Sequence, residues 1–177
     1  NTDNCFVNVH VKGIGCHAMV PERGINAVSR AMHLLSALGE KLDCHSFAAS
    51  YEKYIADDYT GGLLGCACSD KESGALTFNP GKITLENNDV KILAGIRYPV
   101  SKKYETFATC IKAVAEKMHC ECKIIDHMSP IYFKRDDEVV VLLEKAYRDV
   151  TDDDVHQPFT VGAATFARTM PNTVAFG

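Results

Sequence analysis

The sequence has no long apolar run and no excess of positive charge, and these two absences exclude several classes of protein. None of its apolar segments approaches the roughly 18 residues that a membrane-spanning helix needs. The formal net charge is -4 and the basic residues are scattered, which argues against binding to nucleic acid or to an anionic membrane surface. We therefore expect a globular protein with neither nucleic-acid nor membrane partners.

Two further absences concern targeting and catalysis. The first residues have neither a basic start nor an apolar stretch before a cleavage site, so we do not expect them to be a signal peptide. The chain contains no H-E-x-x-H, no H-x-D and no glycine-rich phosphate loop after a strand. Its Ser, His and Asp residues form no recognisable catalytic motif. The residues alone therefore indicate no complete hydrolytic site.

Cysteine, in contrast, is abundant, with 8 in 177 residues. Cys66 and Cys68 form one C-x-C pair, Cys120 and Cys122 form another, and four thiolates could hold zinc. Structural zinc sites more often use C-x-x-C, and a free Cys in an apolar segment behaves as a small hydrophobic residue. We favour reduced, unliganded cysteines in a reducing, cytoplasmic compartment, with zinc or disulfides as the alternatives.

The hydrophobic pattern up to residue 130 predicts strand, helix, two or three strands, helix and strand. Alternating apolar residues and turn residues indicate strands at 5–12, 75–79, 82–86, 89–99 and 120–126. Helical spacing indicates helices at 25–38 and, after a Ser101 cap, up to about residue 119, with a partly helical insertion at 40–74. This βαββαβ order predicts a ferredoxin-like α+β sandwich with both helices on one face of an antiparallel sheet.

The pattern changes after residue 130. An amphipathic helix is expected at 136–150, strand-like runs at 158–161 and 173–177, and a small-residue turn into a short helix at 162–168. These elements are typical of part of an α/β domain whose sheet lies elsewhere. We therefore divide the chain into a domain at 1–130 and a partial α/β segment at 131–177.

A loop suited to chemistry lies between the first predicted strand and the first predicted helix. Residues 15–27 read GCHAMVPERGINA, and the small neighbours of His17 leave its ring free to reach outward. Such a histidine can donate a hydrogen bond to a developing oxyanion or to a metal-bound substrate. The simpler interpretation is a surface histidine.

Two further places are candidates for binding an anion. Arg97 ends the strongest predicted strand, and its guanidinium can bind a carboxylate through two parallel hydrogen bonds, although a surface ion pair is the simpler alternative. The backbone N–H groups before the short helix suit a carboxylate or form only a tight turn; they belong to Gly162, Ala163, Ala164 and Thr165. Asn79, in an F-N-P-G run, could be a turn former.

Three motifs resemble, in order, segments of the di-zinc dipeptidases of the aminoacylase/carboxypeptidase superfamily. Residues 15–27 resemble the H-A-x-x-P-E-x-G-x-N-A signature of the lid domain in that family. Residues 94–99 resemble its I-R-Y-P strand, and residues 161–177 resemble its G-G-x-T-Y-A-R and N-x-V-A-F-G segments. The resemblance is closest to the PepV-like dipeptidases, which are of the Xaa-His or carnosine type, and it spans essentially the whole chain.

The resemblance implies a role for each candidate residue. His17 would stabilise the tetrahedral oxyanion, and Arg97 would clamp the C-terminal carboxylate of the dipeptide. Backbone groups of Gly162, Ala163, Ala164 and Thr165 would contact the same carboxylate, although the two alanines stand where glycine is commoner in the family. Asn79 would correspond to a substrate-contacting Asn of related lids.

The resemblance also implies a cofactor and partners. In that family two zinc ions are bound, and their ligands and the catalytic Glu lie outside the segment that this sequence matches. We therefore expect an excised piece, a lid at 1–130 with part of the catalytic domain at 131–177, which is inactive alone. Its partners would be a dipeptide, the rest of the catalytic domain and, in a homodimer, a second copy. The alternatives are a non-catalytic ferredoxin-like module for dimerisation or ligand binding, and the lid of a related deacylase or desuccinylase.

Overall fold

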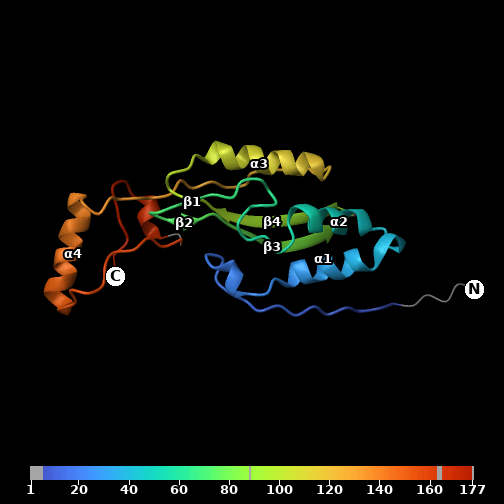
Figure 1. The fold of residues 1–177 in the computed structure, drawn as a ribbon, viewed down its shortest axis with the longest axis horizontal. Helices are drawn as coiled ribbons and strands as arrows, with labels where there is room; N and C mark the ends of the chain where they lie inside the picture. The colour runs from blue at the N-terminus through green and yellow to red at the C-terminus, as the bar shows by residue number, and fades with distance from the viewer. Residues whose placement is uncertain (1–5, 88, 163–164, 177) are drawn as a thin grey trace, which may run out of the picture.

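The computed structural model describes residues 6–87, 89–162 and 165–176, and it shows a mixed α+β protein (Figure 1). The helices are α1 (Ala27–Ala37), α2 (His45–Tyr54), α3 (Tyr104–Lys117) and α4 (Glu138–Thr151), with short 3-10 turns η1 (Pro21–Arg23), η2 (Gly39–Lys41) and η3 (Phe166–Thr169). The strands are β1 (Ser69–Asp70), β2 (Gly74–Ala75), β3 (Thr77–Glu86) and β4 (Asp89–Arg97). The α+β class predicted from the sequence is confirmed.

The long antiparallel hairpin of β3 and β4 is the centre of the fold. Its register pairs Thr77 with Arg97 and Asn79 with Gly95, so Thr77, Asn79 and Arg97 project from one face. The predicted strand at 82–86 and residues 77–79 of the one predicted at 75–79 form a single strand, β3, in which a β-bulge between Pro80 and Lys82 accommodates Gly81. Ala75 belongs instead to β2, and Leu76 lies between the two strands.

The other face of this hairpin contributes to the hydrophobic core. Phe78 of β3 belongs to the same buried cluster as Met32 of α1, Tyr51 of α2 and Phe107 of α3. The apolar faces of the helices thus gather over one face of the hairpin, as the helical spacing predicts. The opposite face, which carries Arg97, stays open, and Leu93 on that face is 51% exposed.

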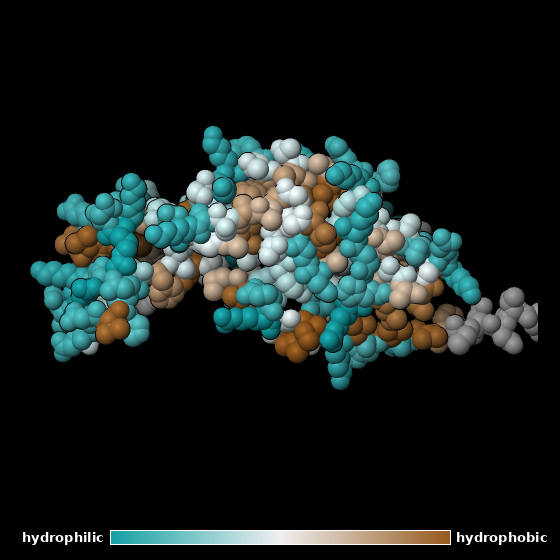
Figure 2. All heavy atoms as spheres, viewed as in Figure 1, coloured by the Kyte–Doolittle hydropathy of each residue, from teal (hydrophilic) through white to brown (hydrophobic). Residues whose placement is uncertain are grey.

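Two predicted outer strands are wrong. Residues 6–12 run extended beside α1 without forming a ladder, and Phe6 and Val7 are 93% and 79% exposed (Figure 1). Residues 120–126 are likewise not a strand, and Ile125 is 70% exposed. Alternation shows which face a strand would bury, but a strand forms only where a neighbouring edge accepts its backbone hydrogen bonds. Figure 2 shows apolar atoms along the lower edge of the molecule, where the N-terminal segment lies.

The connection into α3 is held by Asp70 rather than by the predicted cap. Ser101 is not the N-cap, which is Lys103; instead the Ser101 backbone N–H donates to the Asp70 carboxylate at 3.0 Å. The other Asp70 oxygen accepts from the backbone N–H and the hydroxyl of Ser73 at 2.6 and 2.7 Å. Burial raises the pKa of Asp70, but these hydrogen bonds outweigh it and hold the pKa well below its usual value. Asp70 thereby joins the β1–β2 turn to the start of α3.

The helix predicted at 136–150 is α4, and it lies away from the core (Figure 1). All of α4 is described and none of its residues is buried. The segments at 158–161 and 173–176 form no strands, since they find no sheet edge in the described part of the chain. The division of the chain at residue 130 stays a prediction.

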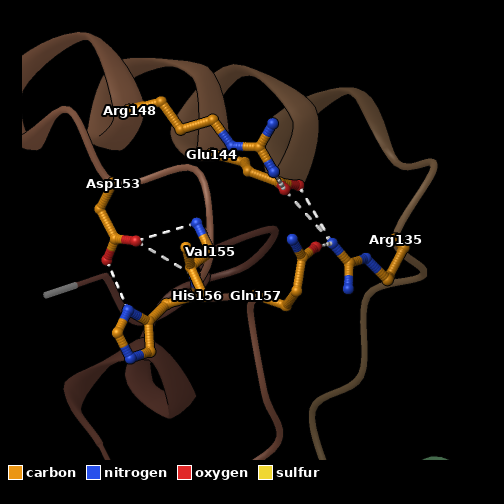
Figure 3. A network of polar contacts seen from close by, with 7 residues as sticks. All are labelled: Arg135, Glu144, Arg148, Asp153, Val155, His156 and Gln157. Carbon is orange, nitrogen blue, oxygen red and sulfur yellow. Dashed lines mark hydrogen bonds and ion pairs between the residues drawn. The ribbon is translucent and has the colours of Figure 1, made fainter.

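Polar contacts order the region around α4 in place of a core (Figure 3). Glu144 accepts from Arg148 at 2.5 Å and from Arg135 at 3.2 Å. After the helix, Asp153 accepts from the backbone N–H groups of Val155 and His156 at 3.0 and 3.1 Å. Exposed ion pairs of this kind contribute little stability. They do not replace apolar burial here, since Val150 is 85% exposed. No helix in the described ranges is long and apolar enough to cross a membrane.

Candidate functional site

A short backbone bridge closes the loop that carries His17. Ile14 and Ile25 exchange two hydrogen bonds of 2.9 Å, so the chain leaves and returns at the same place. Within the loop, the backbone N–H of Val20 donates to the His17 carbonyl at 2.9 Å, and Pro21 then starts η1. Pro fixes φ and suits the first turn of a helix. The loop therefore holds His17 exposed between a closed base and a rigid turn.

Gly24 makes this closure possible because it approaches the other side of the loop closely. A Cβ atom at Gly24 would lie 2.6 Å from the Cys16 sulfur and 2.7 Å from the Ile14 carbonyl oxygen. We expect Gly24→Ala to lower the free energy of unfolding by about 1–3 kcal/mol through overpacking. Gly15→Ala is the matched control in the same loop, because a Cβ there meets nothing within 4 Å; its effect should stay within about 0.5 kcal/mol. Urea denaturation measures both, and equal effects would contradict the close approach.

The orientation of the His17 ring follows from one hydrogen bond. The backbone N–H of Met19 donates to His17 Nδ1 at 3.2 Å. A nitrogen that accepts carries no proton, so the neutral ring has its hydrogen on Nε2. The Nε2–H group is then a donor at the exposed edge of the loop. A ring held in this way can offer a hydrogen bond to a ligand without first changing its tautomer.

Arg97 joins the His17 loop to the C-terminal segment. Its Nη1 donates to the Ala18 carbonyl at 3.0 Å, and its Nε donates to the Gly162 carbonyl at 2.5 Å. These partners lie 79 and 65 residues away along the chain. The structure thus brings together three of the predicted sites, His17, Arg97 and Gly162, on the open face of the hairpin.

The two backbone contacts leave part of the guanidinium free. Of its five N–H groups, those on Nη2 and one on Nη1 make no hydrogen bond to the described residues. Adjacent Nη1 and Nη2 hydrogens can bind a carboxylate end-on through two bonds. Arg97 can therefore brace the loop and bind an anion at the same time.

Gly162 packs against the His17 loop through Met19. Its backbone N–H lies 3.0 Å from the Met19 sulfur, and an added Cβ would lie 2.7 Å from Met19 Cγ. Only glycine allows this approach without a shift of the Met19 side chain. Thr165 is half-buried before η3, and its carbonyl accepts from the backbone N–H of Arg168 at 3.2 Å. The contacts of the described residues do not place Thr165 beside His17 or Arg97. Ala163 and Ala164 lie outside the described residues.

Two clefts border the His17 loop. One, of about 260 Å³, is lined by Asn79 together with Cys16, Asn26 and Tyr59. The other, of about 310 Å³, is lined by Met19, Tyr59 and Thr77, among other residues. Asn79 therefore shares a face with Arg97 but opens into the cleft on the Cys16 side of the loop. The buried Thr77 hydroxyl in the other cleft has no hydrogen-bond partner among the described residues.

Tyr59 is the residue that the sequence analysis missed, and it lines both clefts. It lies in the segment treated only as an insertion, in a loop rich in Asp and Gly. The backbone N–H of Phe78 donates to the Tyr59 carbonyl at 2.8 Å, which fixes the loop against β3. Burial, followed by the charge of Asp57, raises the pKa of Tyr59. Its only sequence signal is an aromatic residue in a turn, which does not reveal a distant cleft.

The described residues do not offer a metal site. No three His, Cys, Asp or Glu side chains among them are grouped so that they could hold a metal ion. The seven cysteines that the structure describes carry free thiols. Burial, together with Cys110 and Cys68, raises the pKa of Cys66 to about 11, which disfavours the thiolate that zinc requires. The C-x-C pairs therefore do not fit a zinc cluster within the described chain.

Comparison with known proteins agrees with the motifs. The sequence profile of the peptidase dimerisation domain of the M20 family matches residues 4–95, which include the His17 loop, α1, α2 and most of the β3–β4 hairpin. The chain belongs to this M20 peptidase dimerisation domain family. The predicted relationship to peptidases is thereby confirmed at family level, while metal dependence, PepV-like specificity and two zinc ions stay predictions.

The similarity to curated proteins extends over more of the chain than this M20 domain does. A Staphylococcus saprophyticus protein, described provisionally as a dipeptidase, is 30% identical over 176 residues, which cover 99% of this chain and 37% of the relative. Two Staphylococcus aureus proteins, from strains MW2 and USA300, carry the same description and are each 28% identical over the same share of both chains. The chain thus spans little more than a third of these relatives.

Proposed function

We propose that this M20 domain chain binds the substrate in a zinc-dependent dipeptidase. The observation that carries the proposal is the contact of Arg97 with both Ala18 and Gly162. This contact places the exposed His17 loop, the unused N–H groups of Arg97 and the backbone of Gly162 on the same open face of the β3–β4 hairpin. The dipeptidase descriptions of the similar proteins support the same activity.

His17 is proposed to stabilise the oxyanion that forms when water attacks the peptide carbonyl. The Met19 N–H that reaches Nδ1 leaves Nε2–H as the donor toward the substrate. A donor fixed in advance stabilises charge that develops in the transition state more than it stabilises the ground state. This role suits the exposed position of the ring in a closed loop.

Arg97 is proposed to bind the C-terminal carboxylate of the dipeptide. One Nη1 hydrogen and both Nη2 hydrogens make no hydrogen bond to the described residues, and bidentate binding through these two nitrogens would fix both the charge and the position of the carboxylate. Gly162, Ala163, Ala164 and Thr165 are proposed to contact the same carboxylate through backbone groups. Asn79 is proposed to contact the substrate from the adjoining cleft.

The remaining parts of the proposal concern what lies beyond this chain. Two zinc ions, with ligands outside this sequence, would supply an activated water to the enzyme when bound. The match to a dimerisation domain supports a homodimer, and the same protein is proposed to be cytoplasmic. A non-catalytic module is not favoured, because the similar proteins carry dipeptidase descriptions over 99% of this chain.

The proposal is tested with the full-length protein and with residues 1–177 alone. We expect the full-length protein to hydrolyse dipeptides only when zinc is present, and the 177-residue chain to show no hydrolysis above the rate without enzyme. A panel of dipeptides, N-acyl amino acids and N-succinyl amino acids separates the related activities. Hydrolysis of acyl substrates alone would favour a deacylase, and full-length protein without any hydrolysis would overturn the proposed activity.

A further inference from the structure

A histidine on α1 lies between two carboxylates from other parts of the chain. His33 Nε2 is 2.9 Å from Asp57 Oδ2, in the loop after α2, and Nδ1 is 2.5 Å from Glu52 Oε1, on α2. Its side chain is 42% exposed, so water can supply and remove its proton. His33, Glu52 and Asp57 are distant in sequence from His17 and Arg97. None of the three has a role in the proposed substrate binding.

Both ring nitrogens can donate only when the imidazole is protonated. In the neutral ring one nitrogen carries a lone pair instead of a proton, and that lone pair would face a carboxylate oxygen at hydrogen-bond distance, which is unfavourable. The cost is high at Glu52, because its buried Oε1 meets no other donor among the described residues and its 2.5 Å contact with His33 Nδ1 is a close charge contact rather than a well-aligned hydrogen bond. The hydrogen bond of Asp57 raises the pKa of His33; burial opposes this, and the charge of Glu52 raises the pKa further.

The other charged and titratable groups around His33 leave these two carboxylates as its partners. On α1, Arg30 directs its guanidinium to the Lys12 carbonyl at 3.0 Å. On α2, the Tyr51 hydroxyl is paired with Ser29 at 3.0 Å, and Lys53 lies over the Tyr54 ring. In the loop, the Asp58 carboxylate accepts from Thr60 and Leu63, and Tyr59 adds a phenol whose pKa is raised.

Asp57 connects this cluster to the clefts beside the His17 loop. It lies two residues before Tyr59, the residue that lines both clefts. On its other side, Ala56 has a φ of 27°, and its carbonyl accepts from Ser29 at 3.2 Å. A φ in this region is strained for alanine, so contacts on either side must hold the segment in place. Release of Asp57 would remove one of them.

We propose that His33 is a proton-controlled clasp that holds the loop at 57–63 against α1 when the imidazole is charged and loosens it when the imidazole is neutral. The clasp is a property of the fold, and only its consequence for substrate binding rests on the proposed function. The charge on His33 thereby sets how firmly Tyr59 is positioned between the two clefts.

The direction of the pH effect follows from the raised pKa. The stabilisation of the loop by the clasp is complete at pH values below the pKa of about 6.5 of an unfolded histidine. It is lost as the pH rises through the folded pKa of His33, which is raised. Each unit by which the folded pKa exceeds the unfolded one allows about a tenfold change in the ratio of held to open loop. The loop should therefore exchange amide hydrogens more readily at pH 8.5 than at pH 6 after correction for intrinsic rates.

The test uses hydrogen exchange and mass spectrometry on the full-length protein between pH 5.5 and 8.5. Exchange at the histidine C2 position gives the pKa of His33, and exchange of peptides covering 57–63 gives the protection of the loop. We expect a pKa above 6.5 and a protection factor that falls several-fold through that pKa. In His33→Gln the loop should have low protection at every pH. The control His10→Gln changes an exposed histidine in the N-terminal segment, and it should leave the decrease in loop protection with pH unchanged.

Asp57→Asn keeps the size of the side chain and removes its charge. It serves as a second test if His33→Gln does not fold. We expect it to lower the pKa of His33 and to move the fall in protection to lower pH by the same amount. A His33 pKa at or below 6.5, or loop protection that does not follow the His33 titration, would overturn the clasp. Neither readout depends on peptidase activity, so a failure of the proposed function would leave this test intact.

Discussion

Under the proposed function, replacement of His17 by alanine in the full-length protein is expected to lower kcat for dipeptide hydrolysis by about 100- to 1,000-fold with little change in KM. A single oxyanion donor contributes to the transition state by about that factor, and it contributes little to the bound ground state. The structure gives the ring the required form, because Met19 N–H occupies Nδ1 and leaves Nε2–H to donate. Steady-state kinetics with one dipeptide at saturating zinc measures both constants.

The control for this prediction is Cys16→Ala at the neighbouring position. Cys16 is also exposed in the loop, and within the described ranges the one hydrogen bond of its thiol is a weak contact of 3.6 Å to the Pro21 carbonyl. We expect it to keep kcat within a few-fold of the wild type, since its side chain is not proposed to face the oxyanion. An unchanged kcat in His17→Ala would remove His17 from the mechanism, and an equal loss in both variants would indicate a collapsed loop.

The second large effect is expected for Arg97→Ala, which should lower kcat/KM for dipeptides with a free C-terminal carboxylate by about 10- to 100-fold. Hydrogen bonds to a charged group contribute about 1.5–3 kcal/mol, which corresponds to this range. The loss should lie mainly in KM, because the carboxylate is bound equally in the ground and transition states. Dipeptide amides, which lack that charge, should lose much less.

Substrates and variants together separate the two roles of Arg97. Its bonds to Ala18 and Gly162 hold the loop for every substrate, whereas its free N–H groups act only on a carboxylate. Arg97→Lys should keep attraction for the carboxylate but lose the double brace, since an ammonium lacks the planar fork. Lys91→Ala on the same face of β4, where Lys91 pairs with Glu86 at 2.9 Å, should have little effect. Equal losses on dipeptides and their amides would contradict the carboxylate role.

The helices were the most predictable part of this fold. The apolar spacing in 25–38 and 136–150 gave α1 and α4 to within a few residues, because a helix satisfies its own backbone hydrogen bonds locally. The outer strands at 5–12 and 120–126 failed for the opposite reason. Their alternation is real, but a strand needs hydrogen bonds from a neighbour that local sequence does not specify.

The candidate site was predictable only as separate motifs. His17, Arg97 and Gly162 each stood out in a segment whose residue order resembles a family pattern. The M20 domain match over residues 4–95 confirmed the relationship at the level of that domain, and of the three residues it includes only His17. Tyr59 carried no such signal. It reaches the clefts because the Tyr59 carbonyl accepts from Phe78, an interaction between a loop and a strand that no periodicity records.

The sequence by itself determined the family, the amphipathic helices and the residue types that can donate hydrogen bonds to a substrate. Only the tertiary structure decided that Arg97 reaches Ala18 and Gly162, 79 and 65 residues away, and that His33 lies between Glu52 and Asp57. The reason is that periodicity reports the environment of one segment at a time. Contacts between distant segments depend instead on how the segments pack, which is settled by the whole chain at once.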